Sequence, residues 1–106
     1  MATIDDFGKL DIRVAQVVEV RDHPNADKLL LLEIDLGTER RQIVAGLRPY
    51  YRREELLGKK IVVVANLESV KLRGEESRGM LLAAQDGSAV VILAPERDMA
   101  VGSRVR

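Results

Sequence analysis

The stretch that decides the fold is YYRREELLGKKIVVVAN, residues 50–66. Its first half, Tyr50 to Leu57, is rich in good helix formers and predicts a short helix, and Gly58 stands where a glycine commonly ends one. Its second half, Lys59 to Asn66, contains a continuous apolar run that is typical of a buried strand. The elements on either side of this helix and strand then set the order of the whole chain.

Three strands are predicted before the helix. Asp11 to Val20 alternates apolar and polar residues, and a bulge near Gln16 would restore the phase where the alternation breaks. Residues 22–27, DHPNAD, predict a turn because proline fixes φ and because Asn and Asp can hydrogen-bond their own backbone. Lys28 to Leu36 and Arg41 to Ala45 follow as a hairpin, closed by the glycine-containing turn between them.

Further strands are predicted after the buried one. Gly79 to Gln85 forms a fifth strand, and the Asp86-Gly87 turn leads into a short extra strand, Ala89 to Leu93. The C-terminal residues predict an irregular arm that docks on the body of the protein, because Val101 and Val105 are apolar.

Five main strands with a helix between the third and the fourth have the order of an OB-fold, a small Greek-key barrel. A small β-sandwich is the alternative that this order leaves open. We therefore expect residues 1–106 to form a single all-β domain. Its architecture would be an OB-fold, a five-stranded Greek-key barrel with one short helix between strands 3 and 4 and a C-terminal extension.

Composition excludes several classes of function. The chain has 17 basic and 17 acidic side chains, and a net charge of zero disfavours a general polyanion binder. With no cysteine and one histidine it can form neither a disulfide nor a zinc cluster. Aromatic residues make up only 3%, which disfavours single-strand binding by base stacking. No apolar run is long enough to span a bilayer and no secretory signal is present, so we expect a cytoplasmic location.

The sequence predicts a binding module, not an enzyme. His23 has no serine or cysteine nucleophile near it in the chain pattern, and its place before a proline is natural for a turn. The carboxylates form no spaced pair that would act as an acid–base couple. The glycines match neither a phosphate-binding Walker loop nor a dinucleotide motif, and we expect no cofactor and no metal.

Function is indicated by residues 66–84, NLESVKLRGEESRGMLLAA. This loop combines cations, glycines and a hydroxyl, namely Lys71, Arg73, Gly74, Ser77, Arg78 and Gly79. A loop of this kind exposes backbone N–H groups beside positive charges, which suits a phosphate-bearing partner. An ordinary charged strand connection has a similar composition, so the loop does not decide the function by itself.

Five segments resemble a known family when they are taken together and in order. They are DF and DIRV within residues 6–14, HPNADKL at 23–29, IVAGL at 43–47, GKKIVVVANL at 58–67, and the loop at 66–84. They are similar to the tRNA-binding domain family, which occurs as a free-standing small protein and at the C-terminus of methionyl-tRNA synthetases. Many members carry proline where Ser69 stands, so the entry to the loop is expected to be looser here.

The resemblance implies an OB-fold that binds tRNA by shape, near the outer corner of the L, without reading its sequence. It also implies a homodimer that supports aminoacylation, and a methionyl-tRNA synthetase catalytic domain as a partner. Some secretion chaperones resemble the same family, so a dimer that binds unfolded polypeptides is the alternative. A purely structural dimerisation domain is a third interpretation.

The family match also implies which residues contact RNA. Lys71 and Arg73 are two residues apart, so in an extended loop they face one side and would grip phosphates. The periodicity alone would place Met80 in the core, and the family motif moves it to the binding face. The predicted RNA-binding residues are Asp27, Lys28, Asn66, Lys71, Arg73, Gly74, Ser77, Arg78 and Met80, with Lys59 and Lys60 as peripheral phosphate contacts.

Overall fold

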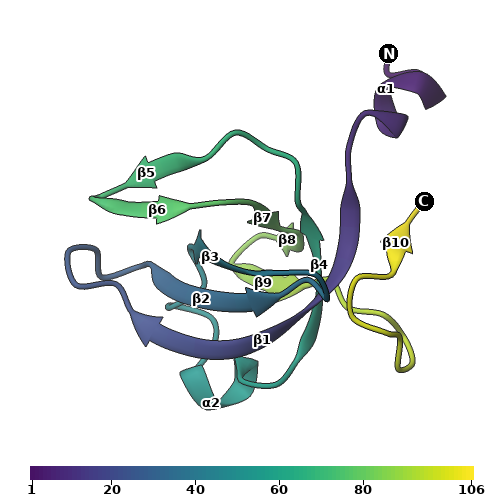
Figure 1. Ribbon diagram of the computed structural model, residues 1–106. Helices are drawn as coiled ribbons and strands as arrows, with labels where there is room; N and C mark the ends of the chain where they lie inside the picture. The colour runs from purple at the N-terminus through teal and green to yellow at the C-terminus, as the bar shows by residue number, and fades with distance from the viewer.

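The computed structural model describes residues 1–106 (Figure 1). Its helices are α1 (Ile4–Gly8) and α2 (Arg53–Leu56). Its strands are β1 (Ile12–Asp22), β2 (Leu30–Asp35), β3 (Arg40–Ala45), β4 (Lys60–Val64), β5 (Val70–Leu72), β6 (Glu75–Ser77), β7 (Met80–Leu81), β8 (Ala83–Asp86), β9 (Ala89–Ile92) and β10 (Arg104–Val105). None of the helices is long and apolar enough to cross a membrane.

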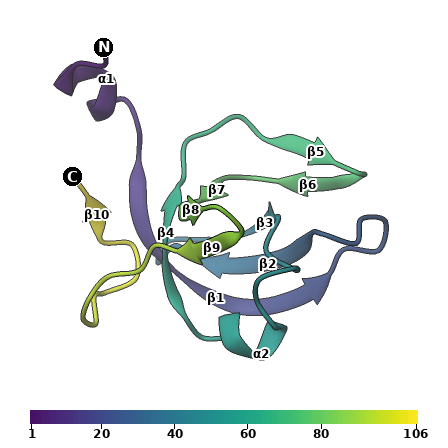
Figure 2. The ribbon, with the colours of Figure 1, turned by 180° about the vertical axis from the view of Figure 1, so that it is seen from behind.

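The main sheet is antiparallel and has the strand order β3-β2-β1-β4-β7, with β10 added on β1. Strand β1 is long and curved, and Figures 1 and 2 show it passing beneath the other strands. It pairs with β4 in its first half and with β2 in its second. Its register against β2 shifts between Val17 and Glu19, so the bulge is present but lies slightly later than the position predicted near Gln16.

The barrel closes where the segment after β6 meets the free edge of β3. Arg78 N donates to Gln42 O at 3.0 Å, and Val44 N donates to Ser77 Oγ at 2.9 Å. Strands β1, β2, β3, β4 and β7 thus surround one interior, and α2 lies between β3 and β4 in the chain. The predicted OB-fold is confirmed, including its short helix.

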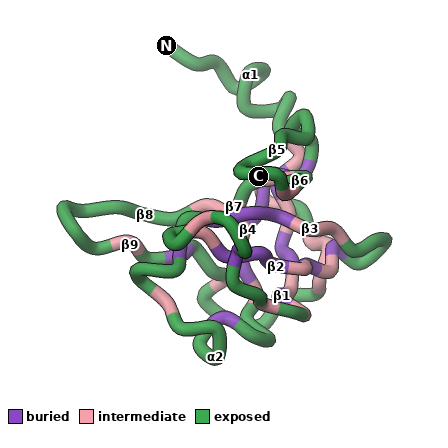
Figure 3. Tube along the Cα trace, turned by 90° about the vertical axis from the view of Figure 1, so that its left-hand side faces the viewer, coloured by how far each residue is buried: buried purple, intermediate pink, exposed green.

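The core is made of aliphatic side chains from the inner faces of these strands. Leu32, Ile34, Ile43 and Val63 are fully buried, and Leu56 of α2 closes one end of the barrel. Figure 3 shows the buried residues gathered along the centre of the barrel, with β8 and α1 exposed. Each such side chain contributes about 1.5–3 kcal/mol by burial, so the barrel is a rigid support for its loops.

The helix is shorter than predicted from Tyr50 to Leu57. The amides of Tyr50 and Tyr51 both donate to Leu47 O at 2.9 Å, which makes a turn before the helix begins. Tyr51 packs against the core, and its hydroxyl accepts a hydrogen bond from Ile92 N at 3.1 Å. This anchoring of Tyr51 leaves only Arg53–Leu56 to form the helix.

The predicted fifth strand, Gly79 to Gln85, is interrupted at Leu82. Leu82 N donates to Val62 O at 3.0 Å, while Leu82 O accepts from Leu93 N at 2.9 Å. The chain therefore leaves the barrel after Leu82, and β8 pairs with β9 as a separate hairpin.

The β5–β6 hairpin, helix α1 and strand β10, which lies in the arm predicted to be irregular, were not predicted. The helix had a local signal, because Thr3 Oγ1 accepts from Asp6 N and the Asp6 carboxylate accepts from Thr3 N.

The C-terminal arm docks on β1. Val14 N donates to Ser103 O at 2.8 Å, Gly102 N donates to Val14 O at 2.7 Å, and Val105 pairs with Ile12. Gly102 has φ +89, and a Cβ on it would lie 2.8 Å from Leu36 O, so only glycine fits at this point of contact.

Candidate nucleic-acid interface

The β5–β6 hairpin carries the cations of the predicted loop. Its two-residue turn is Arg73-Gly74, with φ values of 55 and 92, which is the backbone of a type I′ turn. Arg73 is the only residue other than glycine with positive φ, a conformation that costs about 1–2 kcal/mol for an ordinary residue. The turn holds the guanidinium of Arg73 at the exposed tip of the hairpin.

The base of the hairpin is fastened to β3. Gln42 Nε2 donates to Glu76 O at 2.9 Å and to Glu75 Oε1 at 3.3 Å. At the entry to the hairpin, Ser69 Oγ donates to Glu76 Oε2 at 3.1 Å. Ser69 is thus bonded to β6 at the entry to the hairpin, where a looser connection was expected.

Ser77 has a structural position. Ser77 is only 3% exposed. Its hydroxyl accepts a hydrogen bond from Val44 N and donates one to Gly79 O at 3.1 Å. Both functions of the hydroxyl are used inside the protein, so Ser77 braces the hairpin and has no free donor for RNA in this structure. Gly79 follows with φ +131, and a Cβ there would lie 3.1 Å from Val64 O.

His23 joins the two loops that bear the predicted contacts. It is 3% exposed, and its Nδ1 accepts from Asn25 N at 2.9 Å. Nε2 therefore carries the proton of the neutral ring and donates to Leu72 O in β5 at 2.9 Å. Sequence reasoning placed His23 in a turn and assigned it no function. The signal in the sequence was a lone histidine in a polar turn, because both nitrogens of an imidazole ring can form hydrogen bonds and so connect two segments.

Three cations on these loops have no carboxylate within ion-pair distance: Lys28, Lys71 and Arg73. Figures 1 and 2 show the β1–β2 loop and the β5–β6 hairpin projecting on the same side of the barrel. Arg78, at the foot of the hairpin, is exposed and lies 3.9 Å from Glu39. We call Lys28, Lys71, Arg73 and Arg78 the cationic face. Asp27 lies beside Lys28 in the same exposed loop.

Besides Ser77, three of the predicted residues lie away from this face or are engaged elsewhere. Asn66 braces the N-terminal segment, since its Oδ1 accepts from Asp11 N at 2.8 Å and its Nδ2 donates to Lys9 O at 2.7 Å. Lys60 holds the C-terminal arm by donating to Asp98 Oδ1 at 2.7 Å. That hydrogen bond lowers the pKa of Asp98 below its usual value. Lys59 lies beside Lys60, outside the two loops.

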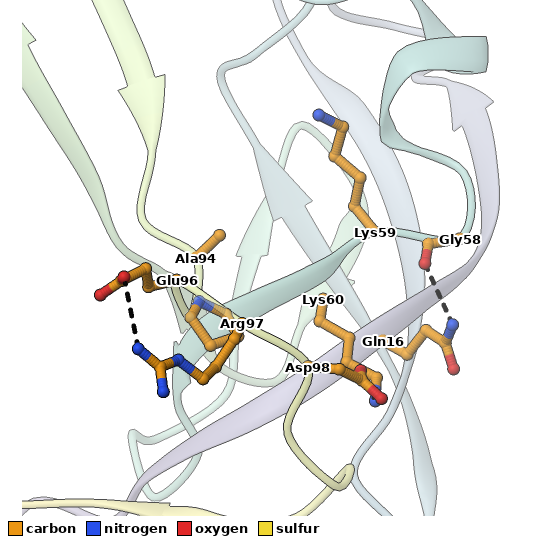
Figure 4. Close-up of a pocket in the computed structure, with 9 residues that line it drawn as sticks. Gln16, Gly58, Lys59, Lys60, Ala94, Glu96, Arg97 and Asp98 are labelled. Atoms are coloured by element: carbon orange, nitrogen blue, oxygen red, sulfur yellow. Dashed lines mark hydrogen bonds and ion pairs between the residues drawn. The ribbon is translucent and has the colours of Figure 1, made fainter.

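The largest surface hollow does not provide an anion site. It has a volume of about 440 Å³ and lies between the start of β4 and the C-terminal arm (Figure 4). Lys60 is paired with Asp98, and Arg97 lies 3.6 Å from Glu96. Lys59 extends away from the Lys60–Asp98 pair in Figure 4. Two of the three cations that line this hollow, Lys60 and Arg97, are therefore paired with carboxylates, and the third, Lys59, stands alone.

Comparison with known proteins settles the family. A family model described as "Putative tRNA binding domain" matches residues 12–104. The chain belongs to the tRNA-binding domain family. It is 56% identical over 104 residues to the methionine–tRNA ligase of Thermococcus kodakarensis, an alignment that covers 98% of the chain and 14% of the ligase. The tRNA-binding domain thus corresponds to about one-seventh of that relative's length.

Solved structures share the whole fold of this tRNA-binding domain. The MetRS related protein of Pyrococcus horikoshii has a TM-score of 0.93 and 34% identity, covering 100% of this chain and 98% of its own. The CsaA chaperone protein of Picrophilus torridus has a TM-score of 0.93 and 31% identity, with 100% of both chains covered. The family relationship confirms that the domain is a non-catalytic module.

Proposed function

We propose that this tRNA-binding domain binds tRNA through the cationic face and recognises its shape. The observation that carries the proposal is the His23 link, which holds two loops together while Lys28, Lys71 and Arg73 remain unpaired. Cations without carboxylate partners are free to neutralise phosphates, and a fixed distance between them selects phosphates at a matching distance.

Each group of the face has a distinct role in this proposal. Arg73 can donate two parallel hydrogen bonds to phosphate oxygens, whereas Lys28 and Lys71 act as point charges. Asp27 would accept from a ribose 2′-hydroxyl, which distinguishes RNA from DNA. The N–H groups around Gly74 would add neutral donors to the phosphates. None of these contacts reads a base edge, so the binding would be independent of sequence.

The second part of the proposal is a homodimer that pairs outside the cationic face. Helix α1 buries none of its residues, and it exposes Ile4 and Phe7, followed by Leu10. Figures 1 and 2 show α1 and β10 on the side of the barrel opposite the β5–β6 hairpin. A second copy would cover these apolar groups and leave both cationic faces open. Two faces would double the number of phosphate contacts.

The third part concerns the cellular role. A domain that holds tRNA beside the catalytic part of a methionine–tRNA ligase would raise the local concentration of tRNA there. The relatives that the chain matches carry such a domain within a longer ligase. We therefore propose that this domain supports methionine aminoacylation in the cytoplasm.

A second candidate is a chaperone-like dimer that binds unfolded polypeptides. The structural likeness to the CsaA chaperone protein favours it, as do the exposed apolar side chains Val70 and Leu72 on the hairpin. The unpaired cations beside these groups favour RNA.

The test is a titration of fluorescent bulk tRNA at several salt concentrations. If four to six phosphates are neutralised, the log–log slope of affinity against salt should be about −3 to −5. The double change Lys71→Ala and Arg73→Ala should weaken all tRNA species alike and make the slope less negative by about 2. Arg97→Ala is the matched control, because Arg97 is exposed but lies outside the face. A flat salt response, or binding of unfolded polypeptide without tRNA, would refute the proposal.

A further inference from the structure

An apolar pocket adjoins the cationic face, and the proposed contacts do not use it. It has a volume of about 230 Å³ and lies between the end of β3, strand β7 and the β8–β9 hairpin. Figures 1 and 2 show β3, β7 and β8 close together. Val44 and Leu47 form its buried floor, Leu81 and Val90 are half-buried walls, and Met80 lies at the rim with 49% of the residue exposed.

Residues that line the pocket contact both loops of the cationic face or their bases. On one side, a Cβ on Gly46 would lie 3.9 Å from Leu29 Cδ2, and Leu29 directly follows Lys28. On the other side, Val44 in the floor is bonded through its N–H to Ser77, at the base of the hairpin. Met80 follows Gly79 in the same segment. A strand of RNA bound at Lys28 and Arg73 would therefore pass the mouth of this pocket.

The residues that line the pocket determine which part of an RNA could bind in it. No charged side chain and no side-chain hydrogen-bond donor line the pocket, so the only polar groups in its lining are those of the backbone. It offers aliphatic surface and the thioether of Met80, which contacts aromatic rings favourably. The flat face of a nucleobase is the part of RNA that matches this surface, and every base has such a face. Loops of folded RNA contain unstacked bases that can be turned out of the strand.

We propose that this pocket receives one unstacked base of a folded RNA whose phosphates lie on the cationic face. The inference rests on the proposed tRNA binding and deepens it. The base is held by apolar contact on aliphatic walls, without an aromatic platform and without hydrogen bonds from side chains to its edges. The pocket therefore accepts any base, but it requires a base that is not stacked in a duplex. It would let a protein without base-specific contacts prefer folded tRNA to a plain RNA helix.

A pair of variants on neighbouring residues tests the pocket. Ala83 and Ala84 are both exposed residues of β8, and their side chains point to opposite faces because strand residues alternate. Ala83 lines the pocket. Ala83→Leu fills its mouth, whereas Ala84→Leu adds the same group on the other face. Both changes leave the cations untouched, and urea unfolding of each variant checks that the barrel is intact.

The probes are bulk tRNA and a perfectly paired RNA duplex of similar length. We expect Ala83→Leu to weaken tRNA binding by about 5-fold or more, because the apolar contact with the base is lost, with an unchanged salt slope. Binding of the duplex should stay as in the wild type, and Ala84→Leu should behave as the wild type with both probes. Equal losses for tRNA and duplex would overturn the inference, because a duplex has no base to insert.

The remaining outcomes separate this inference from the proposed function. If Ala83→Leu binds tRNA as tightly as the wild type, the pocket is not used and tRNA binding itself still stands. If the wild type does not bind tRNA, the proposed function fails and the inference fails with it. If Ala83→Leu loses only the binding of a labelled unfolded polypeptide, the pocket belongs to peptide side chains and the inference is overturned.

Discussion

Replacing His23 gives the sharpest test of how the two loops are held together. In His23→Ala, Asn25 N loses its acceptor and Leu72 O loses the donor from Nε2. Each hydrogen bond contributes about 1 kcal/mol net. The loss of the packed ring adds to these terms. We expect the free energy of unfolding to fall by about 2–4 kcal/mol, and Tm by about 10 °C or more.

Urea unfolding followed by far-ultraviolet circular dichroism measures this change. The midpoint should fall while the slope with urea stays constant, because the barrel core is unaltered. Lys28→Ala is the control for stability, since an exposed loop residue should change it by less than about 0.5 kcal/mol. The affinity for tRNA should also fall, by about 5-fold or more, because RNA must now order the released hairpin.

A second variant separates the two bonds. In His23→Asn the side-chain oxygen can replace Nδ1 as the acceptor for Asn25 N, but the shorter side chain cannot reach Leu72 O. His23→Asn should lower the free energy of unfolding by roughly 1–2 kcal/mol, about half the effect of His23→Ala. The two variants should lose the same amount of affinity for tRNA. The reasoning would be wrong if His23→Ala cost less than about 0.5 kcal/mol, the level of a surface substitution. It would also be wrong if His23→Asn bound tRNA as the wild type does.

Three other predictions follow from single contacts. Gly102→Ala should lower the free energy of unfolding by about 2 kcal/mol or more, as thermal unfolding will measure. Gly87 has φ +58 and open space around it, so the control Gly87→Ala should lower this free energy by only about 1 kcal/mol. The hydrogen bonds from Arg13 and Lys60 lower the pKa values of Asp11 and Asp98, so the stability from these pairs is present at neutral pH. It should be lost as the pH falls below the unfolded value of 3.8, as acid titration by circular dichroism will show. Phe7→Ser should shift a homodimer toward monomer in sedimentation equilibrium, and an unchanged mass would reject α1 as the dimer surface.

The elements that could be predicted from the sequence are those with a strong local pattern. The apolar run in β4, the hairpin of β2 and β3, and the turn between β8 and β9 all lie close to their predicted positions. The order of strands and helix indicated an OB-fold, because few topologies join these elements with short connections, but it left a small β-sandwich open until the family resemblance was considered. The cations of the loop could be named as candidates, since residue type and spacing are visible in the chain.

Long-range contacts decided the rest. Residues 79–85 have the pattern of one continuous strand, but Leu82 bonds to Val62 and Leu93 and breaks it. Ser77, Asn66 and Lys60 have the chemistry of RNA contacts, yet each uses its polar atoms on a distant segment. A sequence records which donors a side chain has, and only the folded chain shows which partners they have already taken. For the same reason His23, unremarkable among turn residues, becomes the link between both loops once Leu72 lies 2.9 Å from its ring.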